Sequence, residues 1–259
     1  MNITKHITFF YVEERIPYIE RLIQEASKYK YITDIFIHTN KNDFKIDIFD
    51  KYINGKIYVI YHDLTNVNPF TLTTKSRDLL CKQKNDYDIF MYIEDDMLFP
   101  CQALEYWLQH NESLIELNYN LGFVRIETKD NEEYITDLYG EQMDKIITIK
   151  NKRYVVNNKN PYCAMWIYNK KEFNKFVESK YYNLCEIEGY GEREACAIGL
   201  HGKYTSWYKD TIIPLVDNHL DYSCKIYHLP NNYVNADHSG INKFATIKFK
   251  DAISMCVNV

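Results

Sequence analysis

Glu94, Asp95 and Asp96 are three consecutive carboxylates at the end of an apolar, strand-like run that starts near Asp88. Open α/β sheets bind ligands at the carboxyl ends of their strands, and clustered carboxylates beside a phosphate usually hold a divalent cation. The junction therefore predicts a site for a metal ion and a diphosphate. The alternative is a solvated acidic turn, because short motifs often occur without function.

Arg77 supplies a candidate counter-charge for such a site. It lies in the predicted helix 71–84, directly before the acidic strand, in a chain where arginine is much scarcer than lysine. A planar guanidinium donates two parallel hydrogen bonds to a phosphate or a carboxylate, so Arg77 is a candidate diphosphate ligand. An exposed arginine in a surface ion pair is the alternative.

The segment 189–194, Gly-Tyr-Gly-Glu-Arg-Glu, is the second cluster that could do chemistry. Its glycines permit a tight loop, and Glu192 and Glu194 precede an apolar run that predicts a helix. A carboxylate in the first turn of a helix tends to stay ionised, and an ionised carboxylate near a hydroxyl can act as a general base. Helix capping is the commoner use of such glutamates, and the local sequence alone favours it.

His228 lies in the third cluster, which spans residues 225–233. An imidazole that folds back onto a carboxylate-bound cation can complete its coordination shell, and Mn²⁺ accepts mixed oxygen and nitrogen ligands better than Mg²⁺ does. His228 is therefore a candidate metal ligand. A hydrogen-bonded structural histidine is the alternative, and it is the commoner role for a lone histidine.

Alternating strand and helix signals must position these clusters. Apolar runs at 7–12, 34–38, 57–61 and 88–94 predict strands, and helical periodicity at 19–26 and 71–84 predicts helices. This β-α-β order predicts an α/β fold whose first half, about residues 1–120, is a Rossmann-like nucleotide-binding unit. Phe10 and Tyr11, at the end of the first strand, and His38 to Asn40, after the second, are then candidate contacts to the base and ribose.

The second half of the sequence has a different texture. Strands are predicted at 121–126 and 163–168, and a hairpin is predicted over 146–156 with its turn near Asn151. These signals indicate a smaller, β-containing half over about residues 121–259. No repeat, low-complexity linker or Gly/Ser-rich hinge separates the halves, so we expect one compact unit over residues 1–259.

Composition narrows the class of protein further. The chain has 259 residues, a formal net charge of −5 and no long basic run, so it lacks the electrostatic footprint of a nucleic-acid-binding protein. Seven scattered cysteines without a Cys-x-x-Cys pair favour reduced thiols. The N-terminus has no signal-peptide pattern, and no apolar run approaches the ~20 residues of a membrane span. We therefore expect a cytoplasmic protein, which remains compatible with peripheral membrane association.

Together and in this order, the three clusters resemble the metal-dependent nucleotide-sugar glycosyltransferases of the GT-A fold. The resemblance covers most of the chain and includes the stretch 68–77, Asn-Pro-Phe-Thr-Leu-Thr-Thr-Lys-Ser-Arg. In that superfamily an acidic motif, often aspartate-any-aspartate and in several families Glu-Asp-Asp, binds manganese together with the sugar diphosphate. The resemblance implies that Asp96 is a metal ligand and that Glu94 or Asp95 touches ribose or sugar. It also implies that His228 corresponds to the family's C-terminal histidine.

The resemblance implies an activity as well. A sugar would move from a nucleotide diphosphate donor, most commonly uridine diphosphate, to a hydroxyl of a glycan, lipid-linked or protein-linked acceptor. Mn²⁺ or Mg²⁺ would assist, Glu192 or Glu194 would be the base, and a single displacement would invert the anomeric configuration. The acceptor-side loop of the family resembles segment 189–194, but the Trp-Gly-x-Glu-Asp string is missing, so the choice between the two glutamates stays open.

Two other classes of protein fit parts of the pattern. A nucleotidyltransferase of sugar phosphates also joins a Rossmann-like half to acidic metal ligands. It usually carries a Gly-rich phosphate loop near the first strand, and residues 9–15 contain no glycine. A catalytically inactive sugar- or nucleotide-binding module would keep the fold without turnover, and the presence of three separate clusters argues against it.

Overall fold

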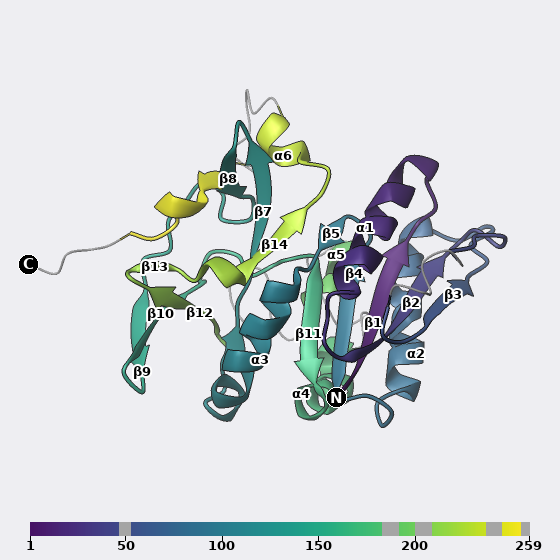
Figure 1. The fold of residues 1–259 in the computed structure, drawn as a ribbon, viewed down its shortest axis with the longest axis horizontal. Helices are drawn as coiled ribbons and strands as arrows, with labels where there is room; N and C mark the ends of the chain where they lie inside the picture. Colours follow the sequence, from purple (N-terminus) through teal and green to yellow (C-terminus); the bar gives the residue numbers. More distant parts are fainter. Residues whose placement is uncertain (47–52, 183–191, 200–208, 237–244, 255–259) are drawn as a thin grey trace, which may run out of the picture. The chain divides into compact units, whose positions relative to one another are not determined.

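The computed structural model describes residues 1–46, 53–182, 192–199, 209–236 and 245–254. The chain forms two compact units (Figure 1). The first unit comprises Met1–Cys101 and Ala164–Gly199, and the second comprises Gln102–Cys163 and Leu200–Val259. In the described residues, no helix combines the length and the hydropathy that crossing a bilayer requires.

The first unit is built on a five-stranded sheet with the order β11-β4-β1-β2-β3. Its strands are β1 (Asn2–Phe9), β2 (Ile32–Thr39), β3 (Ile57–Tyr61), β4 (Ile89–Glu94) and β11 (Met165–Asn169). The first four strands are parallel, and β11 pairs antiparallel with β4. The direction in which parallel strands are added reverses between β1 and β4, and open α/β sheets bind ligands at the carboxyl edge at such a reversal.

Helices and short turns connect these strands. The first unit contains η1 (Glu13–Arg15), α1 (Ile16–Ala26), η3 (Pro69–Thr71), α2 (Leu72–Lys82), β5 (Met97–Leu98), α4 (Lys170–Glu178), η4 (Lys180–Tyr182) and α5 (Glu192–Ile198). Helix α1 buries the apolar face that its periodicity predicts, made of Ile19, Leu22, Ile23 and Ala26. Strand β4 is buried along its whole length, as expected of a parallel strand with both faces covered. The predicted β-α-β half is confirmed.

The entry to α2 is capped by Asn68, in the short turn before the helix begins. The side chain of Asn68 accepts the amide hydrogen of Phe70, and Pro69 occupies the first position of η3, which leads into α2. Thr71 and Thr73 instead donate their hydroxyls back to main-chain carbonyls. The chain therefore turns tightly at the sheet edge before α2 begins.

The second unit contains two sheets. One has the order β15-β8-β7-β14, and the other has the order β13-β12-β10-β9 with β6 alongside β12. The strands are β6 (Asn120–Leu121), β7 (Val124–Lys129), β8 (Glu132–Ile135), β9 (Ile146–Ile149), β10 (Lys152–Val156), β12 (Thr211–Val216), β13 (His219–Leu220), β14 (Lys225–His228) and β15 (Ile247–Lys248). The helical elements are α3 (Cys101–Glu116), η6 (Tyr222–Cys224), α6 (Asn232–Asn235) and η8 (Phe249–Asp251). This part matches the predicted β-containing texture.

Two-residue turns close the hairpins of the second unit. Lys150 and Asn151 both have positive φ, at 47° and 65°, which is the signature of a type I′ turn between β9 and β10. Asp217 and Asn218 form the same kind of turn between β12 and β13, with φ of 48° and 66°. The hairpin predicted around Asn151 is confirmed, because asparagine tolerates the left-handed conformation that this turn requires.

The division of the chain differs from the predicted halves that meet near residue 120. The chain leaves the first unit after Cys101 and returns to it at Ala164. It returns because β11 pairs with the outer edge of β4, and α4 and α5 follow it there. Strand pairing of this kind links segments far apart in sequence, so no change in local composition marks the boundary.

Candidate functional site

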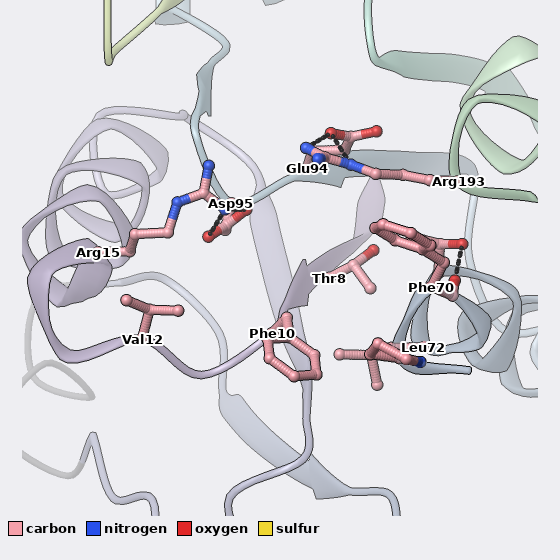
Figure 2. Close-up of a pocket in the computed structure, with 11 residues that line it drawn as sticks. Thr8, Phe10, Val12, Arg15, Phe70, Leu72, Glu94, Asp95 and Arg193 are labelled. Atoms are coloured by element: carbon pink, nitrogen blue, oxygen red, sulfur yellow. Dashed lines mark hydrogen bonds and ion pairs between the residues drawn. The ribbon is translucent and has the colours of Figure 1, made fainter. Parts of the chain in front are cut away.

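A pocket of about 470 Å³ opens in the first unit where β1 and β4 end (Figure 2). Thr8 reaches it from β1, and Glu94 and Asp95 reach it from the end of β4. The other lining residues come from the segments that follow β1, from the entry to α2 and from α5; they are Phe10, Val12, Arg15, Pro69, Phe70, Leu72, Thr73 and Arg193. The pocket thus lies at the strand-order reversal and within the volume range of small-molecule sites.

Two arginines pair with the acidic triplet, whose three side chains are all buried. Nη1 of Arg15 lies 2.9 Å from both carboxylate oxygens of Asp95, and its Nη2 donates to Asp96. Nε of Arg193 lies 3.0 Å from Oε2 of Glu94, to which its Nη2 also donates. Figure 2 shows the Arg15–Asp95 pair and the Arg193–Glu94 pair among the residues that line the pocket. The three carboxylates are therefore held close together by two guanidinium groups.

The ionised form of Asp95 is disfavoured in these surroundings. Burial raises the pKa of Asp95 to about 7, and the neighbouring Asp96 carboxylate adds to this rise against the opposing Arg15. A divalent cation would favour the ionised form, and carboxylate oxygens are the ligands that Mg²⁺ and Mn²⁺ prefer. The chemistry of these carboxylates therefore suits such a cation, although among the described residues they are not arranged as a ready-made ligand group.

The pocket also has an apolar, exposed side. The side chains of Phe10 and Phe70 are 41% and 54% exposed, and Leu72 lies beside them (Figure 2). Exposed aromatic rings at the mouth of a pocket suit the face of a base or a sugar. The buried hydroxyl of Thr8, which also lines the pocket, has no hydrogen-bond partner among the described residues. It is a polar group that a ligand could satisfy.

Three of the residues predicted to contact the base and ribose do not share one environment in the structure. Phe10 lines the pocket, whereas Tyr11 packs against Phe9 and Phe44 and is not among the lining residues. His38 is fully buried, and its two ring nitrogens contact other histidines. Of these three residues, the geometry supports a ligand contact for Phe10 alone.

Arg77 has a different environment from the one its position suggested. Its guanidinium donates to the main-chain carbonyls of Tyr181, Tyr182 and Cys196 at 3.0, 2.6 and 3.1 Å. The ring of Phe176 also lies 5.1 Å from the guanidinium carbon. Arg77 does not line the pocket, so nothing in this geometry supports its predicted diphosphate contact. It ties α2 to η4 and α5 instead.

Arg15 and Arg193 are the cations that sequence reasoning missed at this site. Arg15 follows the carboxyl end of the first strand, which is where a ligand-facing residue should be sought. Arg193 lies between the two glutamates of the predicted loop and contacts Glu94 from there. Glu192 is the first residue of α5, and its side chain lies outside the described part, as does the loop 189–191. Glu194 is exposed. The general-base role of either glutamate stays a prediction.

His228 belongs to the second unit, where it ends β14. Its Nδ1 hydrogen-bonds a carboxylate oxygen of Glu127, which is fully buried, and the other oxygen accepts the amide hydrogen of Val234 at 2.8 Å. Such a carboxylate fixes the orientation of an imidazole in structural and metal-binding roles alike. In the described part of the chain, no group of three or more His, Cys, Asp or Glu residues is arranged to hold a metal ion.

Comparisons with known proteins do not assign the chain to a family. No protein-family model matches the chain, and no curated protein matches its sequence. Among solved structures, the crystal structure of S. aureus TarS 1–349 is similar over 90% of this chain and 63% of that chain, with a TM-score of 0.44 and 13% identity. The chain therefore spans less than two thirds of the length of that structure. A likeness of this size carries no conclusion about function.

Proposed function

We propose that the chain is a glycosyltransferase that moves a sugar from a nucleotide diphosphate donor to a hydroxyl acceptor. One observation carries the proposal: the pocket at the reversal between β1 and β4 joins a buried acidic triplet to an exposed aromatic wall. A nucleotide sugar has the matching parts, since its diphosphate needs a cation and its base needs an apolar face.

Each wall of the pocket has a part in binding the donor. Phe10 and Phe70 would contact the base or the sugar ring, and Thr8 would hydrogen-bond a ligand oxygen or nitrogen. The side chains of Arg15 and Arg193 are 28% and 39% exposed, so they can reach a ligand while still paired with carboxylates. Guanidinium groups bind phosphate as readily as carboxylate, so these two arginines replace Arg77 as the proposed diphosphate contacts.

The proposed metal is Mn²⁺, with Mg²⁺ as the alternative. Asp96 would hold it with the help of Glu94 or Asp95, and His228, oriented by Glu127, stays the proposed imidazole ligand. When bound, such a cation neutralises charge on the leaving diphosphate. Glu192 or Glu194 would take the proton from the acceptor hydroxyl of a glycan, a lipid-linked or a protein-linked substrate. A single displacement would invert the anomeric configuration.

Release of free nucleotide from a panel of nucleotide sugars, measured with and without Mn²⁺ and candidate acceptors, tests this proposal. We expect cation-dependent release of nucleoside diphosphate, with uridine diphosphate as the first to try, and loss of release in Asp96→Ala. Pyrophosphate formation from a nucleoside triphosphate and a sugar phosphate would identify a nucleotidyltransferase instead. Donor binding without any release would identify an inactive binding module.

A further inference from the structure

Arg15 and Arg193 are the more exposed members of the charge cluster at the pocket. Arg15 belongs to η1, which follows β1, and Arg193 belongs to the first turn of α5 (Figure 2). Both lie in the first unit and line the same pocket. Their side chains are 28% and 39% exposed, whereas the side chains of Glu94, Asp95 and Asp96 are exposed by 5% or less. A ligand that enters the pocket therefore meets positive charge before it meets the carboxylates.

The two guanidinium groups use carboxylate oxygens that a cation would also use. Nη1 of Arg15 contacts both oxygens of Asp95, and its Nη2 contacts Oδ2 of Asp96. Arg193 contacts Oε2 of Glu94 through Nε and Nη2, and its Nη2 also lies 3.9 Å from Oδ2 of Asp96. Guanidinium groups therefore engage all three carboxylates. This agrees with the absence, among the described residues, of a carboxylate group that is already arranged for a metal ion.

A divalent cation and the arginines compete for these oxygens. A Mg²⁺ ion bound to an oxygen of Asp95 would lie ~2.1 Å from that oxygen, and hence within ~5 Å of Nη1 of Arg15. Positive charges at this separation repel each other, and a guanidinium has no acceptor atom that could bind the ion. A cation that arrives alone must therefore displace an arginine from its carboxylate without offering it another anion.

A diphosphate removes this conflict. Guanidinium groups bind phosphate oxygens with the same bidentate geometry that they use for carboxylate oxygens. A diphosphate can contact the exposed parts of Arg15 and Arg193 before their ion pairs open. It then gives each guanidinium a new anionic partner, and the carboxylates that the arginines leave become ligands for the cation. Each positive group still has a negative partner after the change.

We propose that Arg15 and Arg193 exchange partners when the donor binds. In the empty pocket they neutralise the acidic triplet, and in the loaded pocket they bind the diphosphate while the cation takes their place on the carboxylates. This inference rests on the proposed function and adds a property to it, which is that the cation and the diphosphate bind cooperatively. A divalent cation alone binds weakly, because the two arginines hold its ligands.

Binding of Mn²⁺ with and without a nucleoside diphosphate, measured by electron paramagnetic resonance, tests the cooperativity. We expect the nucleotide to tighten Mn²⁺ binding by on the order of 10- to 100-fold, compared at equal concentrations of free Mn²⁺. Uridine, guanosine, adenosine and cytidine diphosphate are compared, so that the result does not depend on which base fits the pocket. Equally tight binding with and without nucleotide would overturn the exchange alone. No bound Mn²⁺ with any nucleotide would contradict the proposed function as well.

Removal of the arginines separates an exchange from simple charge repulsion. In the double variant Arg15→Met, Arg193→Met, Mn²⁺ alone should bind about tenfold more tightly than in wild type, and the tightening by nucleotide should fall several-fold. Arginines that stayed on the carboxylates would change the two affinities independently and leave the tightening as it is in wild type. Arg21→Met removes an exposed arginine of α1 and is the matched control, which should keep the wild-type tightening. Unchanged tightening in the double variant would overturn the proposal.

Side-chain ¹H–¹⁵N NMR follows the exchange in wild type, so this measurement does not depend on how the variants fold. The Nε–H group of Arg193 donates to Glu94 at 3.0 Å in the empty pocket. We expect its resonance to shift when Mg²⁺ and the nucleoside diphosphate are added together, and to gain a coupling to ³¹P across the new hydrogen bond. Mg²⁺ alone should leave the resonance in place. A resonance that Mg²⁺ and nucleotide together leave unchanged would overturn the proposal.

Discussion

The two units each bury a group of charges, and the two groups differ in how they are paired. In the second unit, Nε and Nη2 of Arg125 donate to the two carboxylate oxygens of Asp137 at 2.8 and 2.7 Å. The guanidinium also lies over the rings of Tyr162 and Tyr233, and both charged side chains are buried. One cation meets one anion here in a closed, bidentate arrangement.

In the first unit, by contrast, two partly exposed guanidinium groups are shared among three buried carboxylates at the wall of a pocket. Burial and the neighbouring Asp96 raise the pKa of Asp95 to about 7, so a bound cation would favour the ionised form of this carboxyl. A closed ion pair has a structural role, whereas clustered carboxylates beside a cavity can bind a cationic ligand. We therefore place function in the first group and stability in the second.

The largest difference between the groups should appear in activity. Asp96→Ala should abolish cation-dependent turnover and leave the fold intact, because it removes one of three mutually repelling carboxylates. Nucleotide release and circular dichroism, measured on the same preparation, check both halves of the prediction. Full turnover in this variant would remove the triplet from the reaction.

The same comparison predicts the opposite behaviour for the closed pair. Asp137→Ala should destabilise the chain by about 3–5 kcal/mol, because it leaves the buried guanidinium of Arg125 without its anion. Urea unfolding curves of this variant and of Asp96→Ala, recorded together, give the contrast. A loss below about 1 kcal/mol for Asp137→Ala would show that the two groups do not differ in the way we argue.

The two glutamates at the start of α5 test the same distinction, between a functional and a structural role, within a single helix. If one is the general base, its replacement by Gln should slow turnover by ~10² to 10⁴-fold with donor binding nearly preserved. Replacing a glutamate that only caps the helix should cost on the order of 1 kcal/mol. Turnover, donor affinity and melting temperature of Glu192→Gln and Glu194→Gln decide between these roles. Near wild-type turnover in both would exclude a base from this segment.

The smallest expected effect is the pH dependence of stability at Asp95. Its pKa in the folded chain, about 7, lies above the ordinary value of about 3.9, so the folded state binds the extra proton between them. Stability from this group is therefore present at low pH and lost as the pH rises toward 7, by on the order of 1 kcal/mol per pH unit. Urea unfolding from pH 5 to 8 should show that the free energy of unfolding of Asp95→Asn increases relative to that of wild type as the pH rises. A constant difference would contradict the raised pKa.

The first-unit sheet could be predicted because its signals are local. Apolar runs, the periodicity of α1 and the acidic end of β4 are readable along the chain, and they place Glu94 and Asp95 at a carboxyl edge as expected. The position of Phe10 at the pocket is predicted in the same way, because Phe10 stands at the carboxyl end of the first strand. What these predictions share is that each depends on residues within one strand or helix.

The partners of those residues could not be predicted in this way. Arg15 pairs with Asp95 across 80 positions, and Arg77 finds its carbonyl acceptors more than 100 positions away. Such pairings depend on how strands are ordered, and a single sequence does not report that order. His38 is a further example. It was predicted to contact a base or ribose, but its ring contacts His6 instead, and this pairing becomes visible only when β1 and β2 are placed in register.

Binding of Mn²⁺ to the chain, followed by electron paramagnetic resonance in the presence of uridine diphosphate, tests the central claim most directly. We expect one tightly held Mn²⁺ per chain, lost in Asp96→Ala and kept in Asp63→Ala, a carboxylate exposed to solvent outside the pocket. His228→Ala should weaken this binding, more for Mn²⁺ than for Mg²⁺. No bound Mn²⁺ in wild type, or equal binding in Asp96→Ala, would contradict a metal and diphosphate site at the acidic triplet.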